Sequence, residues 1–286
     1  MKLLFYLITF IPISFIRCAV IFYTELRFHK TSSVYKLTLC NIKICFPELS
    51  DADKVLLAEQ SFIETFVSGY ETLQAWARPI HISGKKIFRI ENNYLLSQNI
   101  SNKNGLAIIA IHNRSVDMLL KWINAKTKTT TLYKKVKIKS LDRFVRNQRE
   151  DNSNEVYETN INGVRKIFKA FKENKVVCLA ADQVPQTGMG EYIKFFNTDA
   201  YTTTLAASMV YKTKKSGVFI CINSFANNSL GVTIKPTMNS IYNESEYKLS
   251  LNQSIEDLIR INPKDYSWEY KRFRRSPSGI DPYDGI

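Results

Sequence analysis

The chain is short of histidine, and its histidines lack the surroundings of a metal site. Only three occur among the 286 residues, at positions 29, 81 and 112. None belongs to an H-E-x-x-H motif or pairs with a cysteine at metal-ligand spacing, so we expect no zinc or other metal site. We infer no cofactor either.

Motifs of covalent catalysis and of phosphate loops are also missing. There is no G-x-S-x-G elbow, which argues against a serine hydrolase, and Gly188-Met-Gly190 is too short for a glycine-rich phosphate loop. Ser115 lies too near His112 in sequence to reach its imidazole easily, and we expect it to cap a helix. A nucleophilic mechanism is therefore not supported.

The five cysteines form no C-x-x-C pair, and their number is odd. Cys178 and Cys221 lie inside apolar runs that predict core strands. This pattern favours reduced, buried thiols in a cytosol-facing domain over a disulfide framework.

Acidic residues are outnumbered, 26 against 40 basic ones, for a formal net charge of +14. Such an excess suits nucleic acid, an anionic membrane surface or a phosphorylated substrate. An AT-rich genome is an alternative source of the total, but it does not explain the clusters at Lys134–Lys139 and Tyr270–Arg275. Most of these side chains are expected in solvent; Arg149 and the terminal cluster are the better candidates for binding anions, because arginine can grip them bidentately.

No apolar run is long enough to span a bilayer without interruption. Leu3–Ile16 would extend about 21 Å as a helix, short of the roughly 30 Å hydrocarbon core. Two arrangements stay open: a spanning helix extended to Tyr23 that carries Arg17, or an in-plane helix kinked at Pro12. No small-x-small cleavage site follows, so we predict an uncleaved anchor over residues 1–30 and a catalytic domain over 31–286, facing the cytoplasm by the positive-inside bias.

The remaining sequence alternates between helical and strand patterns. A long helix is predicted to start at a Ser50 cap, and its range is 49–77. Short buried strands are expected at 106–111, 176–181, 218–223 and 232–235, and helices at 118–124, 141–149, 161–173 and 200–212. This order predicts an α/β fold with a central, mostly parallel sheet flanked by helices.

The segment Ala110-Ile-His-Asn-Arg-Ser-Val-Asp117 is the most informative for chemistry. His112 follows a strand, and Asp182 follows another, which is where active groups gather in such sheets. Asp117 lies five residues after His112, in the first turn of a helix. We expect this carboxylate to contact the imidazole and fix its tautomer, so that the other ring nitrogen takes a proton from a hydroxyl.

Five segments together resemble the lipid A late acyltransferases. Asn41-Ile-Lys-Ile-Cys-Phe-Pro-Glu-Leu-Ser50 is similar to that family's N-x4-F-P-E entry to a long helix, and His112–Asp117 matches its H-x4-D/E motif. The other segments are Tyr133–Arg149, the stretch from Asp182-Gln183 through Gly190, Tyr192, Phe195, Phe196, Ala200 and Thr202, and the ending Tyr266-Ser-Trp-Glu-Tyr-Lys-Arg-Phe-Arg-Arg-Ser-Pro277.

The resemblance implies a glycerol-3-phosphate-acyltransferase-like sandwich on a membrane-anchor helix at the inner membrane. It implies transfer of a fatty acyl group from acyl carrier protein to a hydroxyl of a phosphorylated lipid A precursor. His112 is then the general base and Asp117 its partner, while Arg149, Asp182, Gln183 and Arg114 are expected at the substrate. A basic mouth suits both an anionic acceptor and an acidic carrier protein.

Three departures from the family pattern bear on acceptor identity and chain length. Asp117 stands where close relatives often have Glu, Lys134-Lys135 replaces Arg-Pro, and Asn113–Val116 is not the usual aromatic-rich filler. We expect Arg114 to lower the pKa of His112.

Three rival readings remain. One is an H-x4-D acyltransferase that acts on a lysophospholipid or glycolipid; the terminal Tyr266–Pro277 block argues against it. Another is a non-catalytic basic protein that binds a membrane surface or nucleic acid; aromatic and basic residues do not interleave as nucleic-acid binding requires, so we expect no nucleic-acid partner. The last is an inactive relative, which the intact His112, Asp117, Arg149 and Asp182 disfavour.

Overall fold

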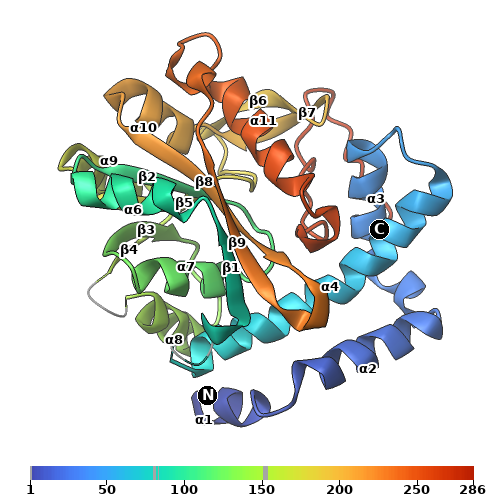
Figure 1. The fold of residues 1–286 in the computed structure, drawn as a ribbon. Helices are drawn as coiled ribbons and strands as arrows, with labels where there is room; N and C mark the ends of the chain where they lie inside the picture. Colours follow the sequence, from blue (N-terminus) through green and yellow to red (C-terminus); the bar gives the residue numbers. More distant parts are fainter. Residues whose placement is uncertain (1, 80–81, 83, 151–153) are drawn as a thin grey trace.

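The computed structural model describes residues 2–79, 82, 84–150 and 154–286. His81 lies outside the described residues. A central sheet is covered by helices on both faces, with two further helices of the N-terminal segment along one side (Figure 1). The predicted α/β architecture is confirmed.

Seven strands form the central sheet in the order β1-β9-β8-β2-β5-β3-β4. Their bounds are β1 Ile87–Glu91, β2 Leu106–Ala110, β3 Thr129–Tyr133, β4 Glu155–Glu158, β5 Val176–Ala180, β8 Ser216–Ser224 and β9 Leu230–Pro236. All neighbouring pairs are parallel except β8 and β9. β2 is fully buried, as its unbroken apolar run predicts for a strand covered on both faces.

The connections leave β2 and β5 toward opposite faces of the sheet. α7 (Val116–Asn124) follows β2 and packs on the face that also carries α6 (Asn93–Asn102) and α8 (Lys139–Arg149). α9 (Ile161–Lys172), α10 (Leu205–Thr213) and α11 (Tyr247–Ile259) cover the other face (Figure 1). The change of face between these two connections marks the carboxyl ends of β2 and β5 as the position where open α/β sheets bind ligands.

The long helix α4 (Asp51–Ala77) confirms the predicted one, and Ser50 caps it by accepting a hydrogen bond from the backbone N–H of Asp53 at 3.1 Å. Ser115 caps α7 in the same way, through the N–H of Met118 at 3.1 Å. α4 passes the carboxyl end of β2, where the Ser115 and Thr72 hydroxyls lie 2.8 Å apart. Both predicted caps are confirmed, and the Ser115 cap starts α7 directly after the end of β2.

One predicted helix is wrong in its first part. The range 200–212 was expected to be helical, but Ala200 to Thr203 belongs to β7 (Thr198–Thr203), which forms an antiparallel hairpin with β6 (Gly190–Phe195). The β-branched threonines there favour a strand, and α10 begins only at Leu205. Cys178 and Cys221 lie buried in β5 and β8, as predicted.

The N-terminal segment forms two short helices, α1 (Lys2–Ile8) and α2 (Ile13–Glu25), that break before Pro12. Both pack against α4, and α3 (Ser33–Cys45) follows them. Arg78, the residue that follows α4, holds the segment between α1 and α2 by donating hydrogen bonds to the Oγ1 and carbonyl of Thr9, each at 2.8 Å. The expected kink is present.

A single N-terminal membrane-spanning helix was one of the two predicted arrangements. Among the described residues, no helix has both the length and the apolar character that crossing a membrane requires.

Candidate active site

His112 lies immediately beyond β2, and the C-terminal segment holds its backbone in place. The His112 carbonyl accepts a hydrogen bond from the N–H of Ser267 at 3.0 Å, and the N–H of Arg114 donates to the Asp265 carbonyl at 2.9 Å. Asn113 and Tyr266 form an antiparallel bridge between these two contacts. The strand-end histidine therefore sits in a short, paired segment of backbone.

Asp182, just beyond β5, binds His112 through both carboxylate oxygens. Oδ1 lies 2.7 Å from His112 Nδ1, and Oδ2 accepts a hydrogen bond from the His112 backbone N–H at 2.8 Å. Burial and the negative charge of Asp182 both raise the pKa of the Tyr266 phenol, so this hydroxyl stays protonated near the carboxylate. Because an ionised carboxylate only accepts, this geometry places the imidazole proton on Nδ1 and leaves Nε2 as the acceptor.

The charges of this pair shift both pKa values. Burial alone would lower the pKa of His112, but the negative charge and hydrogen bond of Asp182 outweigh it, and the net pKa is raised above 6.5. Burial alone would raise the pKa of Asp182, yet its bonds to His112 lower it overall. Arg149 acts against protonation of His112, whereas Glu269 acts for it. We expected Arg114 to lower this pKa; the direction is opposite because the carboxylate of Asp182 dominates.

The structure pairs Asp117 with Arg149, not with the imidazole. Arg149 Nε lies 2.7 Å from Asp117 Oδ1 and Nη2 lies 3.1 Å from Oδ2, a two-pronged contact between the last turn of α8 and the first turn of α7. The contact expected between Asp117 and His112 is taken by Asp182. The first turn of α7 directs the Asp117 carboxylate toward α8, which sequence spacing alone does not reveal.

Arg114 was expected at the substrate, but its side chain lies in the interior. It is 4% exposed and binds the carboxylates of Glu64 and Glu71, with Asp265 3.4 Å away. It does not line the cavity described below. Arg114 is therefore a structural cation in this conformation, and the prediction that it contacts substrate is not supported by its position.

The Arg114 cluster also fixes the backbone next to His112. Arg114 has a positive φ of 58°, a conformation that costs a non-glycine residue free energy unless its surroundings hold it. Its carboxylate partners supply that hold. Glu64 binds a second arginine, Arg17 of α2, at 2.6 and 2.8 Å, so the cluster reaches from the N-terminal segment to the loop after β2.

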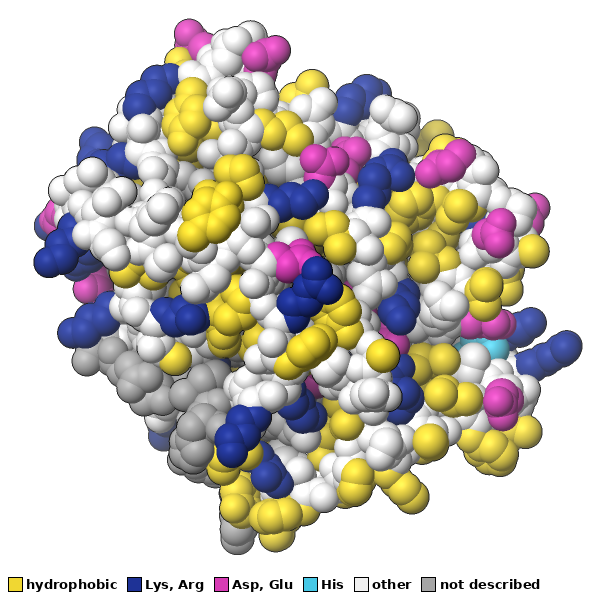
Figure 2. Space-filling view, viewed as in Figure 1, with side chains coloured by type: hydrophobic (Ala, Val, Ile, Leu, Met, Phe, Trp, Pro, Cys, Tyr) yellow, Lys and Arg dark blue, Asp and Glu magenta, His cyan; other side chains and the backbone are white. Residues whose placement is uncertain are grey.

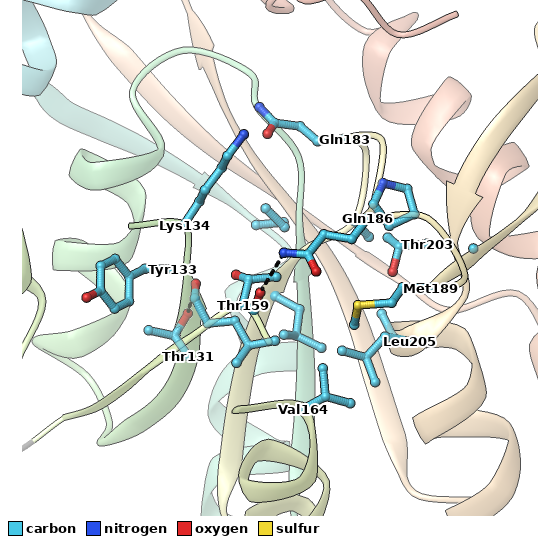
Figure 3. A pocket seen from close by; sticks show the side chains of 18 of the residues that line it. Thr131, Tyr133, Lys134, Thr159, Val164, Gln183, Gln186, Met189, Thr203 and Leu205 are labelled. Atoms are coloured by element: carbon cyan, nitrogen blue, oxygen red, sulfur yellow. Dashed lines mark hydrogen bonds between the residues drawn. The ribbon is translucent and has the colours of Figure 1, made fainter. Parts of the chain in front are cut away.

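A cavity of about 990 Å³ opens at the carboxyl ends of β2, β3 and β5, and His112 lines it. The His112 side chain is 27% exposed, whereas that of Asp182 is 1% exposed. The imidazole thus reaches the cavity while its carboxylate partner stays behind it. Figure 3 shows Lys134 and Gln183 on one side of this cavity and the apolar Val164, Met189 and Leu205 on another.

Basic and polar side chains border the apolar interior. Besides Arg149 and Gln183, the rim includes Lys134, Arg274 and Arg275. Arg275 donates to Thr187 Oγ1 at 2.9 Å, and the hydroxyl of Tyr270 accepts a hydrogen bond from the Val184 N–H at 3.0 Å. Of the four cations in the terminal cluster, Arg274 and Arg275 line the cavity and Lys271 does not, while Arg272 is buried and donates a hydrogen bond to Thr202 Oγ1.

Sequence reasoning missed Tyr266 and the three carboxylates around Arg114. Glu64 and Glu71 are seven residues apart on α4, so they share the helix face that carries apolar residues toward the core. Two acids on an apolar face signal a buried partner of opposite charge, and that signal was available. No comparable local pattern marks Asp265 or Tyr266.

Among the residues that the structure describes, no group of three or more His, Cys, Asp or Glu side chains is placed to hold a metal ion.

Comparison with known proteins identifies the family. Residues 2–275 match the bacterial lipid A biosynthesis acyltransferases. The chain belongs to this family. It is therefore an acyltransferase of lipid A biosynthesis, and the matched range includes His112, Asp182 and the segment that pairs with the His112 backbone.

Individual lipid A acyltransferases are similar to this chain at low sequence identity. The lipid A biosynthesis lauroyltransferase of Escherichia coli K12 is 20% identical over 260 residues, which cover 89% of this chain and 83% of the relative. The lipid A biosynthesis palmitoleoyltransferase of the same organism is 21% identical over 242 residues, covering 84% and 78%. A lipid A biosynthesis acyltransferase of Shigella flexneri has the same identity and coverage.

Proposed function

We propose that this acyltransferase moves a fatty acyl group from acyl carrier protein to a hydroxyl of a phosphorylated lipid A precursor, with His112 as general base. The observation that carries the proposal is the hydrogen bond between His112 Nδ1 and Asp182 at 2.7 Å, with the imidazole exposed to a large cavity. That geometry supports Nε2 as the atom that takes the hydroxyl proton.

In the proposed step, Nε2 removes the proton of the acceptor hydroxyl while the oxygen attacks the thioester carbonyl carbon. A carbon–oxygen bond forms, the carbon–sulfur bond breaks, and the departing thiolate receives the proton from the imidazolium. Asp182 stabilises that imidazolium and fixes the ring through its hydrogen bond to Nδ1. General-base assistance of this kind is worth about 100- to 10,000-fold in rate.

Asp117 and Arg149 act together in this proposal. Arg149 lines the cavity, and Asp117 holds its guanidinium in one orientation through two hydrogen bonds. A fixed guanidinium suits an oxygen-rich anionic group of the donor or acceptor. Asp117 thereby supports the site through Arg149, and Gln183 adds amide hydrogen-bonding groups at the cavity.

We also propose that the N-terminal segment lies on the cytoplasmic side of the inner membrane. Its exposed apolar side chains include Phe10, Phe15, Phe22 and Leu26, exposed by 47% to 69%. Figure 2 shows hydrophobic side chains along the edge of the molecule formed by α1 and α2. An in-plane helix that buries such residues in the interface fits two short helices better than a spanning segment does.

The test uses the full chain in detergent with a mixture of acyl carrier proteins that carry different acyl chains, and a tetra-acylated lipid A precursor. Mass spectrometry of the lipid should show one added acyl group, which His112→Ala should abolish. Transfer to a lysophospholipid in place of the lipid A precursor would contradict the proposed acceptor. Full activity in His112→Ala would contradict the proposed base.

A further inference from the structure

The sheet opens between β3 and β5 at the edge where His112 lies. β3 and β5 pair only as far as Thr131 and Cys178, whereas β2 and β5 remain paired through Ala110 and Ala180. The Thr131 hydroxyl closes the end of the pairing with a hydrogen bond to the Cys178 carbonyl at 2.8 Å. Beyond this point the two strands diverge, and cavity residues come from both faces of the sheet.

On the α7 face, the cavity ends against buried side chains. Leu119 and Ile123 of α7 line it with Thr131 and Cys178, and all four are 5% exposed or less. Ala180 points to this face because Cys178, two residues earlier, does so, and successive strand residues alternate. Ala180 is exposed although β5 lies inside the sheet, so the space in front of it is open. This part of the cavity, the α7 arm, has a closed end.

On the other face, the cavity is a more open groove. Leu132, Val164 of α9, Phe168 and Leu205 of α10 line it, and all four are partly exposed. Figure 3 shows Val164 and Leu205 together at the apolar side of the site. We name this part the α9–α10 arm. It is apolar: the buried Leu179, Ala181 and Ala206 also line it, whereas Val164, Phe168 and Leu205 on its helix side are partly exposed.

We propose that the two arms bind two different hydrocarbon chains: the acyl chain being transferred in the α7 arm, and a chain of the lipid acceptor in the α9–α10 arm. This inference rests on the proposed function, which requires both chains to meet at His112. A closed arm limits the length of the chain that it accepts, whereas an open groove does not. Ala180, paired with Ala110 just before the His112–Asp182 contact, then sets the width of the length-selecting arm.

Charge at the rim agrees with this assignment. Arg149, beside the α7 arm, is held in one orientation by Asp117, which suits an oxygen-rich group of the donor. Lys212 of α10 and Arg275 border the cavity on the side of the α9–α10 arm, where a phosphorylated lipid would place its head group. The acceptor is therefore assigned to the arm with the cationic rim.

The experiment fills each arm with a larger side chain. The series Ala180→Val, Ala180→Leu and Ala180→Phe narrows the α7 arm in steps, and Val164→Phe is the matched change in the α9–α10 arm. Donor preference is measured as the ratio of kcat/KM for myristoyl and decanoyl carrier protein. The ratio should fall progressively along the Ala180 series, by about tenfold or more in Ala180→Phe, with decanoyl transfer retained. Val164→Phe should raise the KM for the lipid acceptor and leave the donor ratio unchanged.

A binding measurement separates this inference from the proposed function. Equilibrium dialysis with radiolabelled myristic acid should show two molecules bound to the wild-type chain and one to either Ala180→Phe or Val164→Phe. If the wild type binds two molecules at separable sites but transfers no acyl group to the lipid A precursor, the two arms are supported and the proposed reaction is rejected. If the wild type transfers the acyl group but the donor ratio is the same in all variants, the assignment of the arms is overturned. A donor ratio that shifts in Val164→Phe and not in the Ala180 series would overturn it as well.

Discussion

Asp182 binds both the ring and the backbone of His112, at 2.7 and 2.8 Å, from the end of the neighbouring strand. In Asp182→Asn the amide keeps the size of the side chain but removes the negative charge that stabilises an imidazolium. We expect kcat to fall by about 100- to 10,000-fold. Steady-state kinetics with acyl carrier protein as donor measure the loss.

His112→Ala supplies the comparison for this prediction. The double variant should be little worse than His112→Ala alone, because residues that act as a unit are not additive. An Asp182→Asn enzyme with nearly wild-type kcat would assign the orienting role to another group.

The pH dependence of kcat/KM should report the same pair. His112 must be neutral to act as a base, so activity should rise with pH through a pKa above 6.5. Asp182 raises this pKa most, Glu269 adds to the rise, and Arg149 opposes it. Asp182→Asn removes the largest favourable charge, and the rise should therefore move to lower pH. An unchanged profile would show that the titrating group is not His112.

The Asp117–Arg149 pair can be tested with a double-mutant cycle on acyl transfer. Asp117→Asn and Arg149→Gln should each reduce kcat/KM. Asp117→Asn releases the Arg149 guanidinium from its fixed orientation, and Arg149→Gln removes the guanidinium. The double variant should lose much less than the product of the two single losses, because the contact is shared. Independent, multiplicative losses would instead indicate that Asp117 acts separately from Arg149.

Arg114 should matter for stability far more than an exposed arginine. Its removal leaves Glu64, Glu71 and Asp265 without their shared cation in the interior. We expect Arg114→Ala to lower the free energy of unfolding by about 3–5 kcal/mol. Arg143→Ala, at an exposed position of α8, is the control and should change it by no more than about 0.5 kcal/mol. Urea titrations compare the two, and equal effects would argue against the buried cluster.

If the protein binds the membrane through α2, polar substitutions on the exposed face of this helix should weaken its affinity for the membrane. Phe15 and Phe22 are 69% and 61% exposed and lie seven residues apart, on one face of the helix. Because burying a phenylalanine contributes about 1.5–3 kcal/mol, Phe15→Ser with Phe22→Ser should weaken binding to anionic vesicles at least about tenfold. Ile161→Ser, an equally exposed position at the start of α9, should leave vesicle binding unchanged. Flotation assays measure both.

Much of the sheet was predictable because its central strands are continuous apolar runs. Residues 106–111 and 176–181 were predicted to within one residue, and His112 and Asp182 followed directly from their ends. β3 begins with three threonines and β4 has a glutamate at each end, so neither shows an apolar run. These strands are recognised only when their pairing with β5 and with each other is known.

The partners within the site were harder to predict than its members. Asp117 is five residues from His112 and Asp182 is seventy residues away, yet the distant carboxylate makes the contact. Neighbouring parallel strands bring their carboxyl ends together, while a helix turn sends nearby side chains in different directions. Arg114 illustrates the same limit: its sequence position suggested substrate, but the carboxylates of α4 draw it inward.

The bond between Arg17 and Glu64 bears on how the chain can be shortened. Glu64 carries two arginines, one from α2 and one from the loop after β2, and together these lower the pKa of the carboxyl although burial alone would raise it. A protein cut after the N-terminal helices would lose one of these cations and expose the face of α4 that they cover. The N-terminal segment is thus part of the folding unit, and a soluble truncated enzyme would require a replacement for that charge.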